Sequence, residues 1–95
     1  MRKADMNPAV EDVLRTQHER GQRGYLSLWT IYDRPNDYPH GFIARRHDVG
    51  RGKSTPAADL LIADLEGLRE VFQNAGLHCI PRQKDDDVKI VESWI

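Results

Sequence analysis

The sequence has a single cysteine and no long hydrophobic run, and each scarcity excludes a class of protein. Cys79 is the only cysteine among 95 residues, so neither an internal disulfide nor a thiolate metal cage can form, and the chain suits a reducing compartment. No apolar run approaches the roughly 20 residues that a membrane-spanning helix needs. Residues 1–6 include basic side chains but precede no apolar stretch, unlike a secretory signal. We therefore expect a cytoplasmic protein without membrane contact.

The chain also carries almost no net charge. Lys and Arg number 14 against 15 Asp and Glu, which leaves a formal charge of -1. No overall field therefore attracts nucleic acid, and any such site must be local. Hydrophobic residues make up 39% and charged residues 31%. This balance supports a modest core under a charged surface, and a chain of this length fits one domain.

Residues 1–24 are predicted to be a polar N-terminal extension. Asn7 can cap a helix that has Pro8 at its first position, which favours a short helix over residues 8–19. Its apolar face is small and consists of Val10, Val13 and Leu14. So few apolar side chains cannot anchor a helix firmly, and we expect the segment to be loosely attached or disordered. Residues 25–95 are then the single α+β domain.

Two strands are predicted at the start of this domain. Residues 25–32 are dense in aromatic and β-branched types, typical of a central strand, and residues 42–49 resume the extended pattern. The intervening residues 33–41 have the prolines, glycine and Asx residues of an ordered loop. We expect the two strands to pair antiparallel. The expected register opposes Ile31 to Ile43, Trp29 to Arg45, and Tyr32 to Phe42.

The next segment allows two interpretations. Apolar residues recur at helical spacing, which favours one long helix from Pro56. The alternative is a short buried strand over residues 59–63, followed by a helix over residues 65–75 that Asp64 caps. In this second interpretation the helix ends at Gly76.

The remaining residues are predicted to form a hairpin. Residues 77–80 and 87–95 are its strands, and the charged turn 82–86 joins them. The order of elements is then ββ(β)αββ. This order predicts an α+β fold, with a small, largely antiparallel sheet of four or five strands and one helix packed on one face.

Two short motifs stand out in the sequence. Residues 29–39 read Trp-Thr-Ile-Tyr-Asp-Arg-Pro-Asn-Asp-Tyr-Pro, and residues 91–94 read Val-Glu-Ser-Trp. In these motifs the chain resembles a family of short uncharacterised bacterial proteins with a Trp-Thr-x-Tyr-Asp-x-Pro-x-Asp-aromatic-Pro motif and a Val-Glu-x-Trp-like end. The resemblance covers residues 27–95. It implies an extended segment at residues 59–63, so we prefer the strand there, and it implies no activity.

Side chains typical of binding sites gather around the loop 33–41. They are Trp29, Tyr32, Asp33, Asp37, Tyr38, His40, Arg45 and Arg46. Trp, Tyr and Arg are favoured at binding hot spots, so we predict a surface that binds a partner or a ligand. The competing interpretation is a structural loop in which Asp33 and Asp37 form Asx turns and Arg45 stacks on Trp29.

Catalysis and metal binding are not expected. An enzyme that used Asp37 and His40 would need a concave pocket beside the loop. His78 and Cys79 are neighbours in a strand and point to opposite faces, so they do not make a zinc site. We expect Cys79 to be buried and inert. No residue is assigned a catalytic role, and no cofactor or metal is predicted.

A basic segment over residues 45–53 suggests nucleic-acid binding as an alternative. Its cationic residues are Arg45, Arg46, His47, Arg51 and Lys53. Such clusters bind phosphates, but Asp48 dilutes the charge, and a solvated basic edge that deters edge-to-edge pairing explains the segment better. Our hypothesis is a non-enzymatic binding or accessory module that contacts a protein partner or a second copy of itself.

Overall fold

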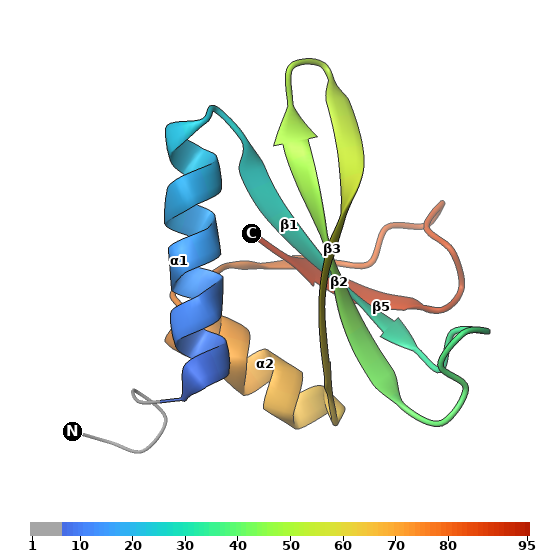
Figure 1. The fold of residues 1–95 in the computed structure, drawn as a ribbon. Helices are drawn as coiled ribbons and strands as arrows, with labels where there is room; N and C mark the ends of the chain where they lie inside the picture. Colours follow the sequence, from blue (N-terminus) through green and yellow to red (C-terminus); the bar gives the residue numbers. More distant parts are fainter. Residues whose placement is uncertain (1–6) are drawn as a thin grey trace.

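A five-stranded antiparallel sheet carries two helices on one of its faces in the computed structural model, which describes residues 7–95 (Figure 1). The elements are α1 (Pro8–Gln22), β1 (Leu26–Asp33), β2 (Phe42–Gly50), β3 (Lys53–Ala63), α2 (Leu65–Asn74), β4 (Cys79–Pro81) and β5 (Ile90–Trp94). The strand order across the sheet is β3-β2-β1-β5-β4. The predicted α+β class is confirmed, and the strands and α2 follow the predicted ββ(β)αββ order.

Helix α1 is longer and more firmly held than the sequence suggested. The Asn7 side chain accepts a hydrogen bond from the Ala9 amide at 2.8 Å, which caps the helix as expected. Val10 and Val13 are buried in the core that the sheet and α2 share. The prediction of a loosely attached segment is therefore wrong for α1, and two helices cover the sheet instead of one. Residues 1–6 of the predicted extension lie outside the described residues.

The ambiguous segment before α2 is a strand, as the preferred interpretation held. Strand β3 begins at Lys53, earlier than predicted, because it pairs with the whole length of β2. The Asp64 side chain then caps α2 by accepting a hydrogen bond from the Gly67 amide at 2.7 Å. A Cβ at Gly67 would come within 2.7 Å of that carboxylate. The glycine therefore leaves room for the cap.

The last two strands form the predicted hairpin, but both are shorter than predicted. Strand β5 begins at Ile90 because the residues before it form a turn, in which the Ile90 amide donates to the Asp87 carbonyl at 2.9 Å. Strand β4 ends with Pro81 at the edge of the sheet, where a missing amide donor is tolerated.

The hydrophobic core lies between the sheet and the two helices. Phe72 of α2 is fully buried, and its ring centroid lies 5.5 Å from that of Trp29 and 5.9 Å from that of Trp94. The cluster consists of Val10, Val13, Trp29, Ile31, Ala44, Leu68, Val71, Phe72, Ala75 and Trp94. Both helices contribute to it, so they share one face of the sheet.

The register of β1 on β2 differs by one residue from the prediction. Ile31 lies opposite Ala44, and Trp29 lies opposite Arg46. Since directly opposed residues share a face, Trp29 and Arg46 both point toward the helices. No helix of residues 7–95 covers the other face of the sheet, which we call the open face. By register its side chains are Leu26, Leu28, Thr30, Tyr32, Ile43, Arg45, His47, Val49, Leu60, Ile62, Ile80, Ile90 and Ser93.

Candidate functional site

The sheet separates the predicted site residues into two groups. Trp29 is 3% exposed in the core, where its Nε1–H donates to Gln17 Oε1 at 3.4 Å. Arg46 is also buried on the helix side. Neither side chain reaches the open face, so both are structural. Tyr32 and Arg45, in contrast, lie on the open face.

Arg46 is held by a network of polar groups beneath α1. Its guanidinium forms ion pairs with Asp48 and, at 2.9 Å, with Asp59 of β3. Asp48 also pairs with Arg20 at the end of α1, at 2.8 Å. A buried guanidinium needs such partners, because removal from water is costly for a charge. These ion pairs therefore account for the burial of the Arg46 guanidinium, and no ligand is needed to balance its charge.

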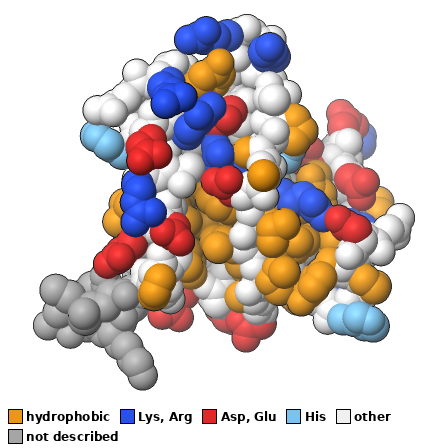
Figure 2. All heavy atoms as spheres, in the orientation of Figure 1, with side chains coloured by type: hydrophobic (Ala, Val, Ile, Leu, Met, Phe, Trp, Pro, Cys, Tyr) orange, Lys and Arg blue, Asp and Glu red, His pale blue; other side chains and the backbone are white. Residues whose placement is uncertain are grey.

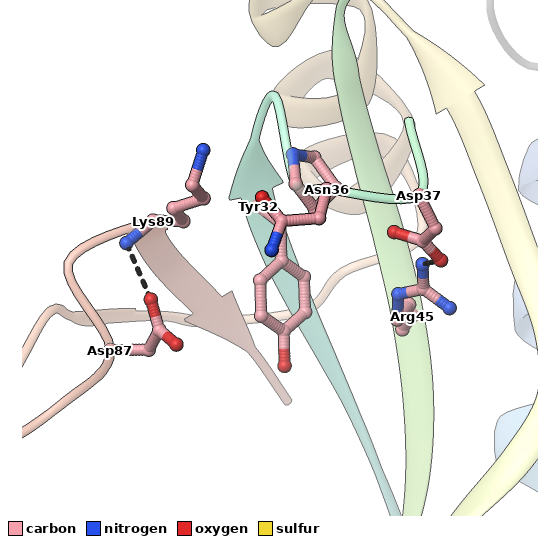
Figure 3. Close-up of a pocket in the computed structure, with 7 residues that line it drawn as sticks. Tyr32, Asn36, Asp37, Arg45, Asp87 and Lys89 are labelled. Atoms are coloured by element: carbon pink, nitrogen blue, oxygen red, sulfur yellow. Dashed lines mark hydrogen bonds and ion pairs between the residues drawn. The ribbon is translucent and has the colours of Figure 1, made fainter. Parts of the chain in front are cut away.

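Tyr32, Asp37 and Arg45 line a hollow of about 340 Å³ at the end of the open face. Figure 3 shows the Tyr32 ring in the middle, with Asp37 and Arg45 on one side and Asp87 and Lys89 on the other. Arg45 forms an ion pair with Asp37 and lies over the Tyr32 ring, with Cζ 6.0 Å from the ring centroid. The hollow thus offers an aromatic floor between two pairs of opposite charges.

Two loops form the walls of this hollow and are tied to each other. The Asp33 amide donates to the Lys89 carbonyl at 2.7 Å, and Lys89 Nζ donates to the Arg34 carbonyl at 2.8 Å. Arg34 has φ of 48°, and its amide donates to the Gly41 carbonyl at 2.8 Å, which closes the loop on itself. These bonds fix the hollow in the free protein, so a ligand or partner would meet a preformed shape.

The charges around the hollow set the protonation of its groups. Burial raises the pKa of the Tyr32 hydroxyl, while the charge of Arg45 opposes the rise and Asp87 adds to it. At neutral pH the phenol is therefore a neutral hydrogen-bond donor. The hydrogen bond from Arg34 lowers the pKa of Asp33. Asp33 points to this local partner and does not line the hollow.

Beside the hollow, two rows of side chains cross the open face. The first row joins Ile62, Ile43, Tyr32 and Ile90 across four strands. The second row joins Leu60, Arg45, Thr30, Ser93 and Ile80 across all five. Within the second row the Thr30 and Ser93 hydroxyls are hydrogen-bonded at 3.1 Å. An apolar row therefore runs beside a row that is polar in its centre and apolar at both ends.

The open face also carries most of the exposed large hydrophobic side chains. Six such residues occur in the described chain, namely Leu14, Leu26, Leu60, Ile62, Ile80 and Val88. Four of them, all except Leu14 and Val88, lie on the open face by register. Figure 2 shows hydrophobic side chains gathered in the middle of the visible side. Leu60 and Ile62 lie together on the edge strand β3, whereas Ile80 lies on the opposite edge strand β4 and Leu26 at the start of β1.

Leu60 and Ile62 are not among the predicted site residues. The signal was the alternation Leu60-Leu61-Ile62, in which only the middle residue can face the core. Leu61 indeed packs against the core. The prediction that the strand over residues 59–63 is buried is wrong, because β3 is an edge strand and Leu60 and Ile62 are exposed.

Asp37 and His40 do not share a site. His40 and Tyr38 line a separate hollow of about 380 Å³ against Ile62 and the start of α2. Asp37 lines the first hollow, where Arg45 is its ion-pair partner. A general acid and a general base that act together must both reach the reacting atoms of one substrate. Asp37 and His40 line separate hollows and therefore cannot do so.

The basic segment 45–53 does not form a continuous surface. Arg45 lies on the open face and Arg46 is buried on the opposite face, as alternation in a strand requires. Arg51 and Lys53 lie at the turn between β2 and β3 and are exposed. The arginines of the strand therefore do not form one basic surface with Arg51 and Lys53 of the turn.

Cys79 is exposed, so the prediction of a buried cysteine is wrong. The short edge strand β4 leaves its side chains open to solvent. Among residues 7–95, no cluster of three or more His, Cys, Asp or Glu side chains has a geometry that could hold a metal ion. Neither helix of the described chain is both long and apolar enough to cross a membrane.

Comparison with known proteins adds no relative. No family model, no curated protein and no solved structure matches the chain.

Proposed function

We propose that this chain is a non-enzymatic binding module whose open face contacts another protein chain, either a partner or a second copy of itself. The observation that carries the proposal is the pair of rows across the open face, with Tyr32 and Arg45 at their centre. Tyr and Arg are enriched among residues that dominate binding energy. Exposed apolar side chains beside polar and charged groups are also typical of protein interfaces.

Three features of the open face support a protein partner over a small substrate. The second row extends across all five strands of the sheet, which suits the large, shallow contact of two chains. Ile62 is 52% exposed although it continues the apolar row. At the Tyr32 hollow, Asp37 pairs with Arg45, and Lys89 Nζ donates to the Arg34 carbonyl. Such charged groups can orient a partner at the rim of a contact.

The test compares two lysine substitutions of equal character. Ile62 on the open face is 52% exposed, and Leu14 on α1 is 48% exposed. Since both side chains are half in solvent, Ile62→Lys and Leu14→Lys should each change the unfolding free energy by less than about 1 kcal/mol. We expect Ile62→Lys alone to abolish association, measured by sedimentation for self-association and by quantitative capture from the native cell for a partner.

Two outcomes would contradict the proposal. One is that the unsubstituted protein stays monomeric at high concentration and captures nothing specifically. The other is that Leu14→Lys loses the same associations as Ile62→Lys, because the contact would then not belong to the open face.

A further inference from the structure

A second, basic surface lies at the end of the molecule where α1 ends and the β2–β3 turn projects. Figure 2 shows Lys and Arg side chains gathered at this upper end. Tyr25 connects the two segments, because Arg20 Cζ lies 5.2 Å and Arg51 Cζ 5.3 Å from its ring centroid. The backbone is close as well, since a Cβ at Gly50 would come within 2.9 Å of the Gly24 carbonyl oxygen. Residues far apart in sequence thus form one surface.

The charge of this surface is unbalanced. Residues 20–25 and 50–53 contain Arg20, Arg23, Arg51 and Lys53 and no acidic residue. Asp48 lies nearby, but its carboxylate is taken up by Arg20 and the buried Arg46. Within residues 7–95, no ion pair involves the three remaining cations. Arg20 therefore anchors the surface, while the other three cations face solvent.

The turn that presents Arg51 has an unusual residue for its conformation. Arg51 has φ of 54° and Gly52 has φ of 78° between the paired residues Gly50 and Lys53. Two positive φ angles define the tight hairpin turn that Asn, Asp or Gly normally occupies at the first position. A long side chain there costs about 1–2 kcal/mol. A locally disfavoured residue at a projecting tip points to a role for its side chain outside the fold.

From this geometry we propose that the basic end binds the phosphate backbone of nucleic acid, independently of sequence and separately from the open face. Guanidinium groups donate paired hydrogen bonds to phosphate oxygens, and clustered cations gain affinity by releasing counterions. Residues 50–55 contain no large apolar side chain. An anionic membrane would need one to insert below its headgroups, so a polyanion in water fits this tip better than a lipid surface.

The test uses the full chain with a fluorescent single strand of about 20 nucleotides and its duplex, measured by anisotropy at several salt concentrations. Contact of three cations with phosphates predicts a slope of log K against log salt of about -2 on the single strand. Arg51→Asn with Lys53→Thr should weaken binding at least about fivefold at low salt and flatten that slope. Asn suits the turn, so the variant should remain folded.

A matched control removes two cations elsewhere. Arg82→Gln with Lys84→Asn removes the same two positive charges' worth of net charge in the exposed turn before β5. Nucleic-acid binding by this control variant should stay close to that of the unsubstituted protein. The proposal is overturned by the absence of binding near 0.02 M salt, an ionic strength at which screening is weak. It is overturned equally by the same loss in both double variants, or by binding to phosphatidylserine vesicles but to neither nucleic acid. Ile62→Lys should leave nucleic-acid binding unchanged, which separates this test from that of the open face.

Discussion

Two adjacent arginines of β2 have opposite surroundings, and this contrast can be measured. The Arg46 side chain is 7% exposed and pairs with Asp48 and Asp59. The Arg45 side chain is 33% exposed and pairs with Asp37 of the loop 33–41. Loss of one member of a buried ion pair strands its partner, so Arg46→Ala should lower the unfolding free energy by about 3 kcal/mol. Arg45→Ala should lower it by less than about 1 kcal/mol.

Urea titration of the two alanine variants, followed by fluorescence of the buried tryptophans, measures both values. Equal destabilisation by the two substitutions would contradict the register of β1 and β2, because that register is what places one arginine on each face of the sheet.

Glu92 makes the stability of the folded protein depend on pH in the acidic range. Its carboxylate accepts hydrogen bonds from Arg69 at 2.9 and 3.0 Å and from Trp94 Nε1 at 2.9 Å. The bonds from Arg69 are the main cause that lowers the pKa of Glu92; burial opposes them, and the Trp94 bond adds to them. A lowered pKa in the folded state means that the ionised carboxylate stabilises the fold above its unfolded pKa of about 4.3.

This stabilisation is lost as the pH falls through the lower, folded pKa. Glu92→Gln should therefore be less stable than the unsubstituted protein by about 1–3 kcal/mol near neutral pH, and the gap should shrink below pH of about 4. Denaturant titrations of both proteins across this range measure the gap. A constant gap down to pH of about 2 would show that the ionisation of Glu92 is not the cause.

Helix α1 is part of the folding unit, which gives a prediction at the level of elements. Val13 is 1% exposed between the sheet and α2, whereas Leu14 beside it is 48% exposed. Val13→Ala removes two buried methyl groups and should cost about 2–3 kcal/mol of unfolding free energy. Leu14→Ala should cost less than about 0.5 kcal/mol.

Thermal and urea unfolding, followed by circular dichroism, distinguish a docked helix from a loose one. If Val13→Ala and the unsubstituted protein unfold alike, α1 is not held in the core, and the loose attachment that its sequence suggested would be correct.

The elements with strong local signals could be predicted from the sequence. Asp64 and Gly67 mark the start of α2, and the proline-rich loop marks the end of β1, so both boundaries were close. Helix α1 was underestimated because distant polar groups hold it. The Gln17 amide donates to the Ser27 carbonyl at 3.1 Å, and Arg20 pairs with Asp48. Neither partner can be identified from the helix itself.

The register of β1 and β2 was missed because both strands are apolar on both faces. Tyr32 and Ile31 each find an apolar partner after a slip of one residue, so the pattern alone does not select one register. The candidate site was accordingly predicted in part. The structure brings Tyr32, Asp37 and Arg45 together but buries Trp29 and Arg46. The resemblance to a family of short bacterial proteins stays a prediction.

Across the molecule as a whole, the two faces of the sheet differ in what their side chains contact. The helix side uses its aromatic residues for the core, where Phe72 packs between Trp29 and Trp94. The open face keeps exposed apolar side chains at a cost in solvation that the fold alone does not require. The basic end lies apart from both, at the turn of β2 and β3. Leu60 and Ile62 are exposed on the open face, so substitutions of these two residues should affect association and leave stability nearly unchanged.

We propose that the open face is covered by another protein chain in the cell. Hydroxyl-radical footprinting inside the native cell, compared with dilute purified protein, reads the exposure of single side chains. We expect Tyr32 and Ile62 to be protected in the cell, while Leu14, with nearly the same exposure as Ile62, is oxidised equally in both samples. Equal oxidation of Ile62 and Tyr32 in the two samples would contradict the account.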